Sequence, residues 1–160
     1  MDERFELELA QIRQELSTLV FPSFTESDAW DLGNLIRSRA VEKQLPIAID
    51  IRVGDAPVFA SMLEGASAEN FDWARRKRNL TLLTNKSSWE ISRLLAAGNN
   101  LIELMGLSLR DYAPHGGCVP IRVKGVSGIV ATLTISGLPQ KQDHEFAVDG
   151  IRDYLNSRSI

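Results

Sequence analysis

The chain has 160 residues, a length at which one domain around one hydrophobic core is the usual arrangement. Its composition is ordinary, with 44% hydrophobic and 24% charged residues, which excludes a disordered or collagen-like chain. The 18 basic and 21 acidic residues give a net charge of −3, which argues against a protein that binds duplex nucleic acid through phosphate contacts.

Cysteine content, the N-terminal segment and hydropathy exclude further classes. Cys118 is the only cysteine, so neither an internal disulfide nor a zinc site with two cysteine ligands can form within the chain. The first six residues are acidic and precede no apolar run, unlike a secretory signal. No stretch approaches the ~18–20 apolar residues of a membrane span. We therefore expect a soluble, cytoplasmic protein without membrane or nucleic-acid partners.

Two helices are predicted at the start of the chain. Residues 2–19 are rich in good helix formers, and four apolar side chains recur there at helical spacing: Phe5, Leu9, Ile12 and Leu16. A second helix begins in the N-cap cluster of residues 25–28 and ends before Pro46. Its apolar stripe runs from Ala29 to Ala40.

The hydrophobic period then changes from helical to strand-like. Residues 47–53 alternate between large aliphatic and other side chains, which predicts a half-buried strand. A tight turn at Gly54-Asp55 and the apolar run 57–62 predict its antiparallel partner. Further helices are then predicted over residues 67–84, 87–98 and 101–105.

A second hairpin and a final helix complete the chain. Strands are predicted over residues 118–123 and 127–135, joined by a turn at Lys124-Gly125. The last helix begins near Gln140. Two hairpins separated by helices predict an α+β fold, in which the hairpins merge into one mostly antiparallel sheet with helices on its faces, an α/β/α sandwich.

Four consecutive cations, residues 75–78, lie in the middle of the third long helix. Successive side chains are about 100° apart around a helix, so the four cannot all face one ligand. One interpretation is a solvated surface or a set of intramolecular ion pairs. The alternative is that one or two of the four, beside Trp73, bind an anion such as a carboxylate, a propionate or a phosphate. For haem propionates, Arg75 or Arg76 is the expected partner.

His115-Gly116-Gly117 precedes the second hairpin and offers a second kind of site. Paired glycines expose backbone amides that can hold an anion, or they simply permit a tight passage into the strand. His115 is a candidate metal or haem ligand, or an acid–base group.

The segment after the second hairpin passes directly from a strand into a helix. Ser136 and Gly137 therefore lie beside the first amides of that helix, a favourable place for an anion. Asp143 and His144 follow in the first turn, where Asp143 also complements the helix dipole. His144 and His115 flank the same hairpin, so the fold can bring the two histidines together.

Taken in order, these motifs resemble the GlcG/HbpS-like family, whose members are called heme-degrading domain-containing proteins. The resemblance rests on four segments: 47–51 with Gly54, 71–79, 116–121, and 136–139 with Asp143-His144. It is closest to an uncharacterised branch of small stand-alone proteins that includes a fungal member. It covers about residues 25–157, so we expect an N-terminal helical arm over residues 1–24 and the family domain over 25–160.

The resemblance implies a mainly antiparallel five-stranded sheet flanked by helices, and homo-oligomers with a dimer as the building block. It also implies binding of haem or of another small anionic molecule, with haem degradation in some members. Haem iron usually takes His, Cys, Met or Tyr, which leaves His115, His144, Cys118, Tyr112 and the methionines, with the two histidines as the main candidates. The expected ligand-binding residues are Trp73, Arg75, Arg76, His115, Gly116, Gly117, Ser136, Gly137, Asp143 and His144.

Two other functions stay open at this point, and so does the question of whether the chain is an enzyme. The apolar stripe of residues 2–19 can dock on a neighbouring subunit as readily as on its own core, which would suit a non-enzymatic homo-oligomeric scaffold or adaptor. Cys118, three residues after His115, would be the nucleophile of a hydrolase or transferase if its strand left the thiol reactive. Asp50, in the middle of a predicted strand, either faces solvent or lines a site.

Overall fold

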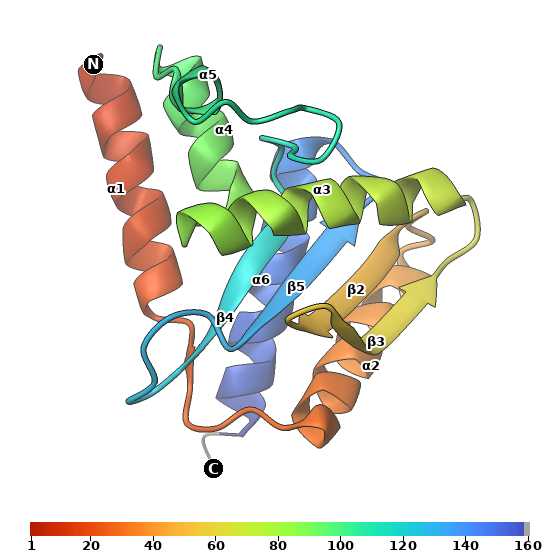
Figure 1. The fold of residues 1–160 in the computed structure, drawn as a ribbon. Helices are drawn as coiled ribbons and strands as arrows, with labels where there is room; N and C mark the ends of the chain where they lie inside the picture. Colours follow the sequence, from red (N-terminus) through yellow and green to blue (C-terminus); the bar gives the residue numbers. More distant parts are fainter. Residues whose placement is uncertain (159–160) are drawn as a thin grey trace.

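The computed structural model describes residues 1–158, in which one sheet is covered by helices on both faces (Figure 1). The strands are β1 Val20–Phe21, β2 Ala48–Val53, β3 Ala56–Met62, β4 Cys118–Val123 and β5 Ala131–Ser136. The helices are α1 Glu3–Ser17, α2 Glu26–Glu42, α3 Ala68–Thr84, α4 Ser88–Ala96, α5 Leu101–Leu104 and α6 Gln140–Ser157. The predicted α+β class is therefore confirmed.

The sheet is mixed, with the strand order β1-β4-β5-β2-β3. Both predicted hairpins are present, and β5 joins them by pairing antiparallel with β2. The fifth strand, β1, pairs parallel with β4, so the sheet is antiparallel in four strands only. The hydrophobic pattern of the sequence did not predict β1, because a strand of two residues shows no alternation. The count of five strands agrees with the family resemblance.

Helices cover both faces of the sheet, which corrects the predicted burial of β2. The predicted start of β5 is corrected as well, for a different reason. In Figure 1 α3 crosses one face, while α2 and α6 lie on the other. Strand β2 is consequently buried from Ala48 to Ile51 and is not half-buried. Strand β5 begins at Ala131, later than predicted, because Gly128 in the preceding loop adopts a φ of +82° that ends the extended conformation.

The two faces of the sheet differ in chemistry. Toward α2 and α6, β2 and β5 present aliphatic side chains such as Ile49, Ile51 and Leu133, which belong to the main hydrophobic core. Toward α3, the alternate positions are polar and buried: Asp50, Thr132, Thr134 and Ser136. Helix α3 therefore packs on the sheet through polar as well as apolar contacts.

Asp50 holds α3 to β2 through a buried ion pair. Arg78 of α3 donates from Nη1 to Oδ2 of Asp50 at 2.9 Å, and Arg52 lies 3.1 Å from Oδ1. Both Asp50 and Arg78 are buried. Asp50 thus does not face solvent, and its charge attaches the helix.

The N-terminal helix packs within its own chain. Leu9 and Ile12 of α1 are buried, and Leu9 joins a second small core with Leu80 and Ile91. The division of the chain at residues 24 and 25 stays a prediction. Within residues 1–158, no helix is long and apolar enough to cross a membrane.

Replacing Arg78 with methionine should destabilise the fold, because it leaves the Asp50 carboxylate buried with a weaker partner. Breaking a buried pair costs about 3–5 kcal/mol, and the remaining contact with Arg52 places this loss near ~3 kcal/mol. Urea unfolding of the single variant and of Arg78→Met/Asp50→Asn measures it, and the double variant should lose less. Arg75→Met, which removes two solvent-accessible pairs, with Asp72 and Asp111, is the control, with a loss below about 1 kcal/mol. Equal losses for Arg78→Met and Arg75→Met would contradict this role of Asp50.

Candidate functional site

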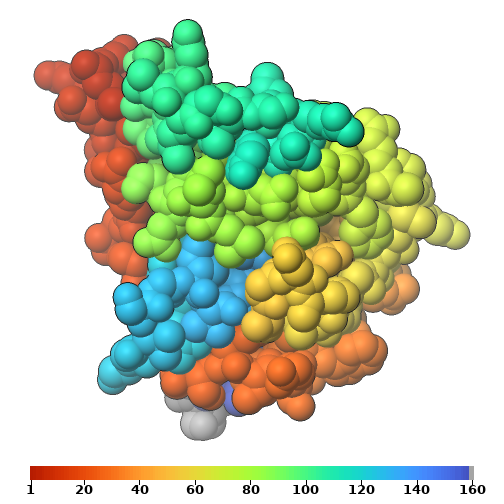
Figure 2. Space-filling model, in the orientation of Figure 1, coloured from red at the N-terminus to blue at the C-terminus, as the bar shows by residue number. Residues whose placement is uncertain are grey.

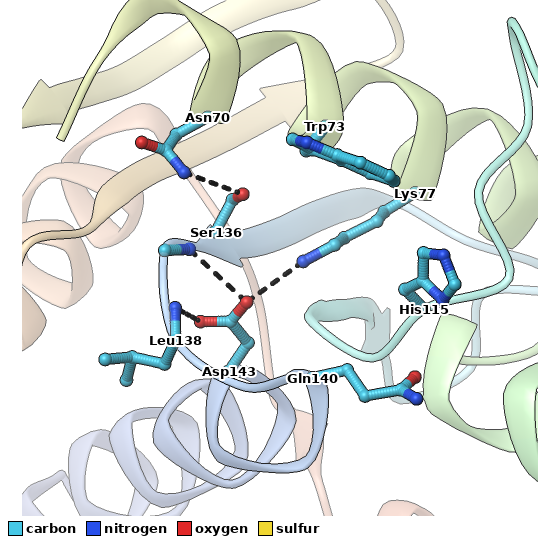
Figure 3. Close-up of a pocket in the computed structure, with 9 residues that line it drawn as sticks. Asn70, Trp73, Lys77, His115, Ser136, Leu138, Gln140 and Asp143 are labelled. Atoms are coloured by element: carbon cyan, nitrogen blue, oxygen red, sulfur yellow. Dashed lines mark hydrogen bonds and ion pairs between the residues drawn. The ribbon is translucent and has the colours of Figure 1, made fainter.

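A cavity of about 280 Å³ opens between α3, the loop before β4 and the start of α6 (Figure 3). Five predicted site residues line it: Trp73, His115, Ser136, Gly137 and Asp143. Four lining residues were not predicted: Asn70, Lys77, Leu138 and Gln140. A larger depression of about 790 Å³ lies between α2 and β3, but its two charged residues, Arg37 and Glu64, are both exposed. The smaller cavity is therefore the candidate site.

A buried ion pair forms the wall of the cavity. Lys77 donates from Nζ to Oδ2 of Asp143 at 3.1 Å and to the carbonyl oxygen of Ile135 at 3.2 Å. Asp143 also accepts from the backbone amides of Leu138, at 2.9 Å, and Gly137, at 3.4 Å. Burial raises the pKa of Asp143 and lowers the pKa of Lys77, although each charge partly offsets the burial of the other. The pKa of the lysine amine and the pKa of the carboxyl group therefore lie closer together than they do in water.

The two glycines before β4 let the chain pass close to Lys77. Gly117 has a φ of +143°, and a Cβ built there would lie 2.3 Å from the carbonyl oxygen of Ile135 and 2.8 Å from Lys77 Nζ. The amide of Gly116 donates to Oε1 of Gln140 at 3.0 Å. This geometry favours the interpretation of the pair as a tight passage into the strand, since the Gly116 amide already has a partner.

An indole and an imidazole ring form the mouth of the cavity. The centroids of Trp73 and His115 are 5.4 Å apart, and the imidazole is exposed. Partial burial lowers the pKa of His115, and the nearby charge of Lys77 lowers it further. The lowered pKa favours the neutral imidazole at pH 7, which is the form that accepts a proton or binds a metal ion.

The other predicted cations are held in ion pairs outside the cavity. Arg75 forms ion pairs with Asp72 at 3.2 Å and Asp111 at 3.0 Å, and Arg76 lies 3.1 Å from Asp72 in a third ion pair. Figure 2 shows the segment after α5, which carries Asp111, lying along α3 on this face. The guanidinium of Arg76 also stacks on Trp73, 3.8 Å from the ring centroid. The four cations of residues 75–78 are thus all paired with carboxylates of the same chain. This agrees with the interpretation of the run as a set of intramolecular ion pairs.

His144 and Cys118 lie away from the cavity. His144 is buried beside Trp89, and its Nε2 lies 3.9 Å from Oε1 of Glu15 on α1. The cavity lining therefore contains His115 without His144, and the fold does not bring the two histidines together there. Cys118 is fully buried, and burial raises the pKa of its thiol, the opposite of what a nucleophilic cysteine requires.

The sequence did contain a signal for the residues that were missed on α3. Asn70, Trp73 and Lys77 are separated by three and four residues, so they share one face of the helix. The run of four cations hid this signal, because it drew attention to consecutive residues instead of to helical spacing. Gln140 gave no such signal, since its position depends on the contact with Gly116.

A family model described as "Haem degrading protein HbpS-like" matches residues 24–152, and the chain belongs to this family. A UPF0303 protein of Azotobacter vinelandii is 42% identical over 152 residues, which are 94% of this chain and 91% of that protein. A UPF0303 protein of Rhizobium leguminosarum bv. trifolii is 42% identical over 146 residues, 91% of this chain and 88% of the relative. The predicted resemblance is therefore confirmed.

Solved structures share the fold. The crystal structure of the Ybr137w protein superposes with a TM-score of 0.85 at 30% identity, covering 93% of this chain and 88% of that one. A structure described as a PduOC:Heme complex has a TM-score of 0.66 at 19% identity, with coverages of 81% and 94%. HbpS has a TM-score of 0.62 at 18% identity, with coverages of 81% and 89%. At these last two identities the likeness is one of fold.

Replacing Lys77 with methionine should raise the pKa of His115, because it removes the nearby positive charge that opposes protonation of the imidazole. An NMR titration of the histidine ring protons in the wild type and the variant measures the change, and the same spectra show whether the variant is folded. Lys141→Met, on the exposed side of α6, is the control and should leave the titration unchanged. An unchanged midpoint for His115 in folded Lys77→Met would contradict the electrostatic coupling.

Proposed function

We propose that this protein binds a small carboxylate-bearing molecule in the cavity between α3 and α6. The observation that carries the proposal is that a buried lysine amine, a neutral imidazole and an indole ring converge on one cavity. Such a set of convergent polar groups beside an aromatic wall is typical of small-molecule sites.

The cavity offers more hydrogen-bond donors than acceptors. An ammonium group has three donors, and Lys77 uses two of them on Ile135 and Asp143. Oε1 of Gln140 already accepts from Gly116 and from Ser92, at 3.0 and 2.8 Å, so its amide nitrogen is the group left to face a ligand. Oδ1 of Asn70 likewise accepts from the amide of Ser67, and its Nδ2 donates to Oγ of Ser136 at 3.5 Å, a long contact that a ligand oxygen can replace. Ligand oxygens that accept hydrogen bonds therefore fit the site best.

The size of the cavity limits the ligand. Drug-sized ligands occupy cavities of about 300–1,000 Å³, and this one has about 280 Å³. A ligand of a few heavy atoms fits, with its carboxylate on Lys77 and its carbon skeleton beside Trp73.

Haem is the second candidate, favoured by the exposed neutral imidazole of His115 and by the haem complex known for a protein of the same fold. The cavity itself does not fit a macrocycle of this size. The residues at its mouth do fit one: His115 would bind the iron, and Arg76, stacked on Trp73, would meet a propionate. Bound there, haem would supply redox chemistry, while the chain would supply binding and orientation.

Assembly through the N-terminal helix is less favoured than it was by the sequence. The apolar stripe of α1 is buried against α4 of the same chain through Leu9 and Ile12. A homo-oligomer, with a dimer as its unit, stays a prediction. Removing residues 2–19 and measuring the mass by light scattering tests whether α1 carries the assembly, and an unchanged mass would contradict that role.

Lactate, a small carboxylate, should bind the wild-type protein in a saturable way and shift the NMR signals of the Trp73 indole and the His115 ring. Lys77→Met should lose this binding, because the variant has no charge to meet the carboxylate, whereas Lys141→Met should keep it. Absence of saturable shifts in the wild type, or binding that survives Lys77→Met, would contradict the proposed function.

Hemin should give a saturable Soret band with the wild type if haem is a ligand. His115→Ala should lose the band, because it removes the exposed imidazole. His144→Ala should keep it, because the His144 ring is 2% exposed and faces Glu15. Featureless, non-saturating spectra for all three proteins would remove haem from the candidates, and loss of the band in His144→Ala alone would contradict the assignment of the iron ligand.

A further inference from the structure

We propose that Lys77 forms a reversible imine with carbonyl compounds that enter this cavity, so that the ligands of the site are small oxo acids. The inference rests on the proposed function, since it uses the same cavity. The carboxylate of an oxo acid brings the ligand to the charged Lys77, and the neighbouring carbonyl group reacts once the amine has given its proton to Asp143. The inference adds a covalent step and names the substrate class.

The placement of Lys77 sets it apart from the other lysines. Of the five lysines in the chain, Lys77 is the buried one, and it lines the cavity. Figure 3 shows its side chain reaching from α3 toward Asp143, with His115 on the neighbouring loop. Gly117 lets the backbone pass beside the amine without a side chain that would collide with it, because a Cβ there would lie 2.8 Å from Nζ. An incoming carbonyl group thus meets an amine held in one position.

The neighbouring ion pair shows that attachment of the helix does not require a lysine. Arg78, the next residue, is also buried and pairs with Asp50 at 2.9 Å. A guanidinium stays protonated at any ordinary pH, whereas a buried lysine can release its proton and act as a nucleophile. The residue that lines the cavity is the one that can change its protonation state.

The environment of Lys77 favours the neutral amine that imine formation needs. A solvated lysine has a pKa of about 10.4 and is almost entirely protonated at pH 7, and each unit of lowering gives about tenfold more free amine. Burial lowers the pKa of Lys77, while the charge of Asp143 acts in the opposite direction. Because burial also raises the pKa of Asp143, this carboxylate, 3.1 Å from Nζ, is a suitable acceptor for the proton.

The reaction balances without a cofactor. The lone pair of the Lys77 amine attacks the carbonyl carbon, and the electron pair of the C=O bond moves to oxygen, which takes a proton to give a carbinolamine. The nitrogen loses a proton in this step. The hydroxyl group then leaves as water after protonation by Asp143, which carries the proton it took from Lys77, and the nitrogen lone pair forms the C=N bond. One amine and one carbonyl give one imine and one water, and hydrolysis reverses the step.

Reductive trapping on the wild-type protein tests the inference. Glyoxylate and sodium cyanoborohydride at pH 7 reduce any imine to a stable secondary amine, which intact mass and peptide mapping locate. We expect one adduct per chain, on Lys77, formed faster than on the exposed Lys43, Lys124 and Lys141, because the lowered pKa of Lys77 raises its fraction of free amine. Label on the exposed lysines with none on Lys77 would overturn the inference.

Two variants and one competitor separate this inference from the proposed function. Lys77→Arg keeps the positive charge but lacks a primary amine, so it should form no adduct at this site, while Lys141→Arg should label as the wild type does. Because the mapping uses the wild type, the result stands even if Lys77→Arg fails to fold. Lactate should slow trapping by competing for the cavity. Saturable lactate binding without any adduct would overturn the imine alone, and absence of both would overturn the proposed function as well.

Discussion

Two buried ion pairs attach α3 to the rest of the protein, and the site depends on that attachment. Arg78 pairs with Asp50 in the middle of β2, and Lys77 pairs with Asp143 in the first turn of α6. Few apolar side chains of α3 are buried, Ala74 and Leu80 among them, so the charges fix the position of the helix. The same attachment places Asn70 and Trp73, earlier on α3, over the end of β5. The contacts that attach α3 therefore also form the cavity.

A buried charge is costly unless it is paired, and this constraint explains why the sheet has two different faces. The α2 and α6 side is built from aliphatic residues and supplies most of the core. The α3 side carries the Asp50 carboxylate and several hydroxyl groups, and α3 supplies Arg78 as the partner of that carboxylate. The polar side opens to solvent at the cavity, where Lys77 and Asp143 meet Ser136 and His115. The polar side chains of the candidate site therefore lie together where α3 meets the end of β5 and the start of α6.

The sequence predicted the helices and strands that show a clear hydrophobic period. It did not predict features that form only through tertiary contacts. Periodicity and turn residues predict β2, β4 and α6, and the structure contains all three. Strand β1 did not follow, since two residues acquire strand geometry only by meeting β4. Burial of Asp50 did not follow either, because alternation in one strand cannot show that a second layer with a cation covers it.

The candidate site was predicted in part for the same reason. Local signals found Trp73, His115 and the strand-to-helix segment, which supply five of the lining residues. Asp143 and His144 were grouped as neighbours, but adjacent residues of a helix point about 100° apart, so one meets Lys77 and the other faces Glu15 of α1. The partner of Lys77 lies 66 positions away in the chain, and that pairing exists only in the folded protein.

The claim on which this account rests is that Lys77 is a buried amine whose protonation is altered by the cavity. An NMR titration of the lysine side-chain carbons next to the amines, in the folded wild-type protein, measures this directly. The account predicts that the Lys77 signal titrates below the usual lysine pKa of about 10.4 and that the midpoint falls further in Asp143→Asn, which loses the stabilising negative charge. A Lys77 signal that titrates in the usual range, unaffected by Asp143→Asn, would contradict it.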